Sequence, residues 1–168
     1  YWLWAPTAFP KHSLYAHVNE DGEGVPWNQA AVLSADGANA QEDGHLAAPK
    51  FNITWKKGTR HASAMRLEST DKGGRPVVVT WKPIETFLMK GIGYTHPEWG
   101  HGVFKGPLVV AREAFKPAEA NPLDFTNLHI QAISTATLEA GGETFQGVGS
   151  FEQLVFGAHE PSGFREIL

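Results

Sequence analysis

Two segments near the end of the sequence alternate their side chains with a period of two, and this pattern limits the fold more than any other feature. In Leu128–Leu138 every second side chain is small or apolar, and those between are mostly polar. Thr144–Phe156 also divides its side chains between two faces. Successive strand residues point to opposite faces, so both segments are predicted to be strands. Gly141-Gly142 between them predicts a hairpin, in which residues whose numbers add up to about 283 lie opposite each other.

Further strands are expected between clusters of turn residues. They are His12–Val18, Trp27–Leu33, Lys50–Lys56, His61–Glu68, Pro76–Lys82, Ile84–Gly91 and Val103–Arg112. Helix is limited to one short turn within Glu113–Ala120. We therefore predict an all-β fold: an antiparallel β-barrel of about 8–10 strands with little helix, because closure removes exposed sheet edges. A β-sandwich is the alternative. The turn His159–Phe164 is expected to close the barrel, with Phe164 docked on it.

The composition fits one globular domain, and residues 1–168 are predicted to be a single β-barrel domain. A net charge of −4 with no basic block argues against nucleic acid as a partner. No apolar run approaches the ~20 residues of a transmembrane helix, and we favour a soluble, bacterial protein of the cytoplasm. The start at Tyr1 suggests an excised or processed chain. It would then be one half of a two-barrel protein, or pair as a homodimer.

The candidate catalytic residues lie in one short glycine-rich segment. Residues 91–102 read Gly-Ile-Gly-Tyr-Thr-His-Pro-Glu-Trp-Gly-His-Gly. Glycine and proline constrain such a segment, which can hold polar side chains in fixed positions. Tyr94, His96, Glu98 and His101 are the predicted acid/base residues, since the pKa values of histidine and glutamate can be tuned to neutrality. Trp99 is a predicted ligand contact. The alternative is an ordinary turn whose rings cap a core.

The same segment leaves a metal site open as an alternative. If the chain is extended there, His96 and Glu98 point to one face, and His101 joins them only where Gly100 bends the chain. Two imidazoles and a carboxylate suit Zn, Fe or Mn. The helical His-Glu-x-x-His signature is absent, because the spacing differs and Pro97 opposes a helix. Our prediction is a protein without a cofactor.

A second polar cluster follows from the predicted hairpin register, which places Glu152 near Gln131 and Leu154 near His129. His129, Gln131 and Glu152 then share one face of the sheet. If that face points into the barrel, the three residues bind a ligand, and if it points outwards they form a cross-strand ladder. The opposite face is at least as apolar.

Aromatic residues on the other predicted strands are candidates for the lining of an apolar pocket. Trp55 shares a face with Phe51 and Ile53, and Trp81 shares one with Val77 and Val79. We predict that Trp55 and Trp81 contact a bound ligand.

The segment Gly91-Ile-Gly-Tyr-Thr-His-Pro-Glu-Trp-Gly100 resembles the Gly-x-Gly-Tyr-x-x-x-x-Trp-Gly motif of lipocalin-like carotenoid hydratases and the related AttH-like proteins. The run from Gly147 to Gly157 is similar to their late barrel strand. The resemblance implies a lipocalin-like barrel, one of two in many members, that encloses an apolar molecule such as an isoprenoid. Some members hydrate a double bond, and some relatives cyclise or isomerise. This chain departs in being about half as long as the two-barrel members, and in having His96-Pro97-Glu98 in the motif.

Together these observations predict an enzyme that acts on a small hydrophobic or isoprenoid-like substrate by cofactor-free acid/base chemistry. Hydration, dehydration, cyclisation and isomerisation all fit. A protonated His96 or Glu98 would donate to an alkene or oxygen, and the faces of Tyr94 and Trp99 would stabilise positive charge. One alternative is a non-catalytic carrier or sensor of a hydrophobic ligand. Another is a metal-dependent barrel enzyme that uses His96, Glu98, His101 and His129.

Overall fold

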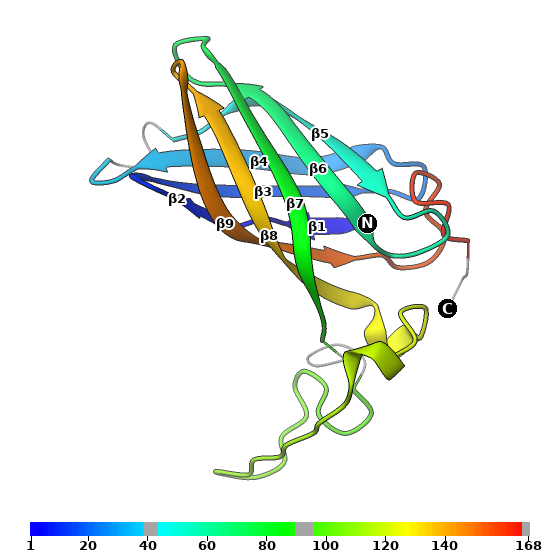
Figure 1. Ribbon diagram of the computed structural model, residues 1–168. Helices are drawn as coiled ribbons and strands as arrows, with labels where there is room; N and C mark the ends of the chain where they lie inside the picture. The colour runs from blue at the N-terminus through cyan, green and yellow to red at the C-terminus, as the bar shows by residue number, and fades with distance from the viewer. Residues whose placement is uncertain (39–43, 90–95, 166–168) are drawn as a thin grey trace.

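The computed structural model describes residues 1–38, 44–89 and 96–165, whose regular secondary structure is almost entirely antiparallel β-sheet (Figure 1). The strands are β1 (Trp2–Trp4), β2 (Thr7–Phe9), β3 (His12–Glu20), β4 (Pro26–Ala35), β5 (Ala47–Trp55), β6 (Ala62–Thr70), β7 (Pro76–Leu88), β8 (His129–Ala140) and β9 (Glu143–Leu154). Two short 3-10 turns, η1 (Pro117–Glu119) and η2 (Phe125–Asn127), precede β8. The predicted all-β class with little helix is confirmed.

All nine strands belong to one sheet, which curves around a single core. Five strands follow one another in the order β5-β6-β7-β8-β9. Both β1 and β2 pair with β9 on one side and with β3 on the other. The last strand, β4, pairs with β3. In Figure 1, β6, β7 and β8 cross diagonally over β1, β3 and β4, so the core lies between the two halves of the sheet.

The two outer strands approach each other at one end of the sheet. The N–H of Leu33 in β4 donates to the carbonyl of Gly44 (2.8 Å), and the N–H of Leu46 donates to the carbonyl of Ala31 (2.9 Å). A single bridge between Val32 and His45 accompanies these bonds. The described residues therefore join β4 to the segment that enters β5, and the sheet curls towards a barrel.

The predicted hairpin and its register are confirmed. Ala140 lies opposite Glu143 beside the Gly141-Gly142 turn, and Gln131 lies opposite Glu152. The residues that point into the core are Ile130, Ala132, Ser134, Ala136 and Leu138 of β8. Since alternate residues face opposite sides, the other set of β8 faces outwards.

Large apolar side chains fill the space inside the curved sheet. Trp81 is fully buried at its centre and its indole N–H donates to Oγ1 of Thr7 (2.8 Å). Phe151, Met65 and Leu67 belong to the same buried cluster. Because a buried indole N–H needs an acceptor, Thr7 fixes how Trp81 sits between the two halves of the sheet.

Two of the strand predictions are wrong. Pro76–Lys82 and Ile84–Gly91 were expected as separate strands, but β7 runs through Pro83 to Leu88 with a register shift between Pro83 and Glu85. A bulge tolerates proline, which cannot donate to the ladder. Val103–Arg112 is not a strand at all, because it lies outside the sheet and pairs with no strand that the structure describes.

The C-terminal turn docks against one end of the sheet as predicted. Phe164 is buried, and the guanidinium carbon of Arg60 lies 4.3 Å from the centre of its ring. The same guanidinium donates to the carbonyl of Leu123 (2.8 Å). Arg60 therefore ties this turn to the chain just before η2. The described residues contain no helix with the length and apolar character needed to cross a bilayer.

Gly149 gives a direct test of the packing between β2 and β9. A Cβ at this position would overlap Thr7 Oγ1 and lie 2.6 Å from the carbonyl oxygen of Pro6. We expect Gly149→Ala to lower the free energy of unfolding by about 2–3 kcal/mol. The measurement is urea unfolding followed by circular dichroism. Ser150→Ala, on the opposite face of the same strand, is the control and should change stability by less than about 0.5 kcal/mol. Equal effects of both variants would contradict the packing.

Candidate functional site

The chain leaves the sheet between β7 and β8 and forms an excursion beside the ends of these strands. The described part, residues 96–128, lies below the sheet in Figure 1. It consists of turns, extended backbone and the two 3-10 turns. This excursion holds the predicted His96, Glu98 and Trp99.

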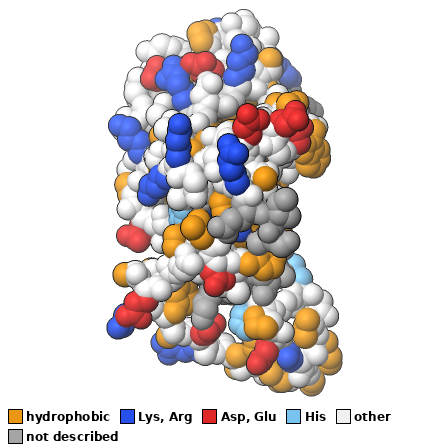
Figure 2. Space-filling view, turned by 90° about the vertical axis from the view of Figure 1, so that its right-hand side faces the viewer, with side chains coloured by type: hydrophobic (Ala, Val, Ile, Leu, Met, Phe, Trp, Pro, Cys, Tyr) orange, Lys and Arg blue, Asp and Glu red, His pale blue; other side chains and the backbone are white. Residues whose placement is uncertain are grey.

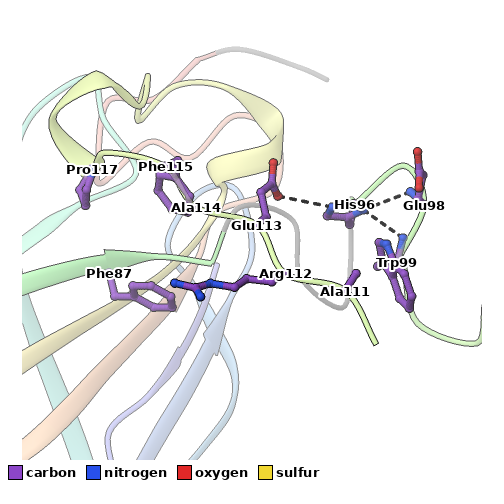
Figure 3. A pocket seen from close by; sticks show the side chains of 10 residues that line it. All are labelled: Phe87, His96, Glu98, Trp99, Ala111, Arg112, Glu113, Ala114, Phe115 and Pro117. Carbon is purple, nitrogen blue, oxygen red and sulfur yellow. Dashed lines mark hydrogen bonds and ion pairs between the residues drawn. The ribbon is translucent and has the colours of Figure 1, made fainter. Parts of the chain in front are cut away.

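A groove of about 660 Å³ lies between the excursion and the end of β7 (Figure 3). Three aromatic rings and a proline give it apolar walls, and four charged or titratable side chains lie among them. The lining residues are Phe87, His96, Glu98, Trp99, Ala111, Arg112, Glu113, Ala114, Phe115 and Pro117. A volume of this size and a mixed lining are typical of sites for small molecules, which run to about 300–1,000 Å³.

The ring of His96 is held in one orientation by the turn that follows it. The backbone N–H groups of Glu98 (3.1 Å) and Trp99 (2.9 Å) both donate to its Nδ1. Pro97 fixes the first φ of this turn and brings the two N–H groups back towards the ring. Because Nδ1 accepts these bonds, the proton of the neutral ring is on Nε2. That Nε2 lies 3.7 Å from Oε2 of Glu113, on the opposite wall of the groove.

A cation without a carboxylate partner lies at the other side of the groove. Arg112 extends along the groove towards Phe87 in Figure 3. Among the described residues, its guanidinium makes no ion pair. Lys105 lies nearby on the excursion, with Nζ 5.7 Å from the centre of the Trp99 ring. The groove thus combines aromatic walls with a guanidinium that is available to an anionic group.

In the comparison with protein families, a family profile matches residues 1–165, which is nearly the whole chain. The chain belongs to DUF8625, a family of unknown function. Comparison with curated proteins and with solved structures gives no match.

The structure brings part of the predicted motif together. His96, Glu98 and Trp99 all line the groove, whereas His101 is exposed in the next turn and Tyr94 lies outside the described residues. The extended backbone considered for this segment is wrong, because residues 97–99 form a turn. As a result the carboxylate of Glu98 points away from the His96 ring in Figure 3, and Glu113 takes the place next to it.

The second predicted cluster lies on the outer face of the sheet. Nε2 of His129 lies 2.5 Å from Oε1 of Glu152, as the predicted register requires. Both residues are buried, with 5% and 6% of their surface exposed, and Gln131 beside them is half-buried. Of the two orientations left open by the sequence, the outward one is observed, since the apolar set of β8 occupies the interior. The pair is nevertheless not a solvated ladder.

Neither predicted tryptophan contact lies in the groove. Trp81 is fully buried in the core and is hydrogen-bonded to Thr7. Trp55 packs edge-on against Tyr1 and His159 at the end of the sheet where the C-terminal turn docks. It also lines a smaller pocket of about 340 Å³ along the β5 edge. Both rings are thus explained by packing, and their role as ligand contacts stays a prediction.

The histidines and glutamate proposed for a metal are not assembled in the part of the chain that the structure describes. There, no group of three or more His, Asp or Glu side chains is placed to hold a metal ion. His96 pairs with Glu113, and His129 pairs with Glu152. Within the described residues each of these imidazoles lies beside a carboxylate, an arrangement that suits proton transfer.

Several residues of the groove are not among the predicted site residues: Phe87, Arg112, Glu113 and Phe115. The sequence pattern places the first in a strand and the others at a strand end and in a short helical turn. A signal was present in the dipeptide Arg112-Glu113, where two opposite charges directly follow an apolar run that Gly106-Pro107 interrupts. Proline and glycine in such a run indicate a loop, and charged residues on loops are common in binding sites.

The buried pair on the outer face should contribute strongly to stability. Glu152→Ala leaves His129 without this carboxylate, and we expect it to lower the free energy of unfolding by about 3–5 kcal/mol. Glu143→Ala, at an exposed position of the same strand, is the matched control and should cost less than about 0.5 kcal/mol. In a double-mutant cycle, the effects of Glu152→Ala and His129→Ala on the free energy of unfolding should not add. Additive effects would mean that the two side chains do not interact.

Proposed function

We propose that the groove beside β7 binds a small, largely apolar molecule that carries an anionic group. The observation that supports this most directly is the position of Arg112 between the aromatic walls, without a carboxylate partner among the described residues. The rings of Phe87, Trp99 and Phe115 supply apolar area, and isoprenoid or acyl chains suit such walls. The guanidinium supplies a planar donor for a carboxylate or phosphate. This proposal places the ligand outside the sheet rather than within a barrel.

Paired ligands that differ only in charge test the proposal. Decanoate and 1-decanol have the same apolar chain, and calorimetric titration measures the affinity for each. We expect Arg112→Gln to weaken decanoate binding about tenfold, the loss expected for one charge-assisted hydrogen bond, and to leave decanol binding unchanged. Trp99→Ala should weaken both ligands. Arg66→Gln, on the exposed face of β6, is the control and should affect neither.

Two results would contradict the proposal. One is the absence of binding for both ligands. The other is binding that Trp99→Ala and Arg112→Gln leave unchanged, which would move the ligand to another surface.

A second candidate function, cofactor-free proton transfer, is favoured by the contact between His96 and Glu113. The N–H groups of the turn occupy Nδ1 of His96, so Nε2 is the nitrogen that can donate, and the carboxylate of Glu113 lies 3.7 Å from it. Glu113 would remove a proton from the carbon next to a carbonyl. The N–H of His96 would donate a hydrogen bond to the oxygen, where negative charge develops. Return of the proton to a different carbon is an isomerisation.

Exchange of hydrogen for deuterium tests this chemistry without knowledge of the natural substrate. Citronellal is an isoprenoid-like aldehyde, and proton NMR in deuterium oxide follows the loss of the signal next to its carbonyl. We expect catalysed exchange that Glu113→Gln and His96→Gln each reduce about 100-fold, as is typical of a positioned acid or base. Glu119→Gln, whose side chain pairs with Lys116, is the control. Exchange no faster than in buffer would leave the groove as a binding site alone.

A further inference from the structure

The excursion exposes a run of apolar side chains that the sheet does not cover. Phe104, Leu108 and Val110 are 83%, 99% and 89% exposed, and Val103 and Val109 are about half exposed. Single apolar residues are common on protein surfaces, but a contiguous run of them marks an interaction site. We call residues 103–110 the apolar segment. In Figure 2, hydrophobic side chains gather on the lower part of the molecule, which the excursion forms.

The backbone of this region is also unpartnered within the described part of the chain. Residues 104–112 make no backbone hydrogen bond to another described residue. Leu108 has a φ of 58°, in the left-handed region that favours glycine. Its side chain packs against nothing that would hold this conformation, because it is almost fully exposed. Backbone without internal hydrogen bonds, together with exposed apolar side chains, is typical of a segment that completes its contacts on another protein chain.

The charges around the apolar segment distinguish between the partners that it could meet. Glu98, Lys105, Arg112 and Glu113 balance one another, whereas the whole chain carries −4. Two copies can therefore approach here without repulsion, and Lys105 of one copy can meet a carboxylate of the other, which leaves Arg112 to the groove. An anionic lipid surface would meet two carboxylates as well as two cations. Insertion into hydrocarbon would also leave the backbone groups unsatisfied, which is costly.

We infer that the apolar segment is an interface between two copies of this chain. A two-fold contact puts the same surface on both sides, so apolar side chains meet apolar side chains. Residues 111 and 112 follow the segment directly and line the groove. A second copy on the segment therefore covers the open side of the groove and limits its access to water. This inference goes beyond the proposed ligand, because the contact forms whether or not the groove is occupied.

Sedimentation velocity of the full chain over a range of concentrations tests the inference. We expect a reversible dimer, and the double variant Phe104→Ser/Leu108→Ser should weaken dimerisation at least about tenfold, as is typical for removal of apolar residues at the centre of an interface. Ile133→Ser/Val148→Ser removes two exposed apolar side chains from the outer face of β8 and β9 and is the matched control. It should dimerise like the unmodified chain. Circular dichroism checks that both variants fold.

Three outcomes would overturn the inference. The unmodified chain could stay monomeric at about 100 μM, well above the concentrations at which specific dimers form. The control variant could weaken dimerisation as much as the segment variant. Vesicles of phosphatidylcholine and phosphatidylserine could bind the monomer in a way that Phe104 controls, which would assign the segment to lipid. Decanoate titration of Phe104→Ser/Leu108→Ser tests the proposed function separately, because this variant retains Arg112. Decanoate binding to it would show that the groove works as proposed even if the segment is not a dimer interface.

Discussion

The side chain of Trp81 fills the space between the two halves of the curved sheet, and the positions of the other candidate residues follow from this. Its hydrogen bond to Thr7 ties β7 to β2 across the interior, and Phe151 and Leu138 pack in the same cluster. A close-packed interior of this kind leaves little room for a ligand. This packing agrees with our proposal that a ligand binds outside the sheet, in the groove that the excursion between β7 and β8 forms with the end of β7.

The groove and the buried His129–Glu152 pair are connected through the outer face of three neighbouring strands. Phe87 of β7 lies opposite Gln131 of β8, and Gln131 lies opposite Glu152 of β9. These residues form one row across the sheet, which runs from the wall of the groove to the buried pair. The pair fixes β8 against β9 at the point where the excursion returns to the sheet. A stable base of this kind is what a binding site built largely from loops requires.

Much of the sheet could be predicted from the sequence, because its longest strands carry simple signals. Gly141-Gly142 and the alternation on both sides set the hairpin register, which agrees with the structure at Gln131 and Glu152. The apolar side chains of β8 indicate which face of this strand lies inside. The burial of His129 and Glu152 could not be predicted, since their face reads as polar. Val103–Arg112 has the composition of a strand but no strand to pair with, and composition alone does not show this. Glu113 reaches His96 because the chain reverses between them, a long-range contact that a local pattern does not encode.

The position of a bound ligand is the most direct test of the central claim that binding takes place outside the sheet. Isotope-filtered NMR of the labelled chain with unlabelled decanoate reports which protein protons lie within about 5 Å of the acyl chain, a separation close to that of packed apolar side chains. The account predicts contacts with Phe87, Trp99 and Phe115 and none with Trp81 or Phe151. Contacts with Trp81 and Phe151 would contradict it, because they would place the ligand inside the sheet as in a lipocalin-like barrel.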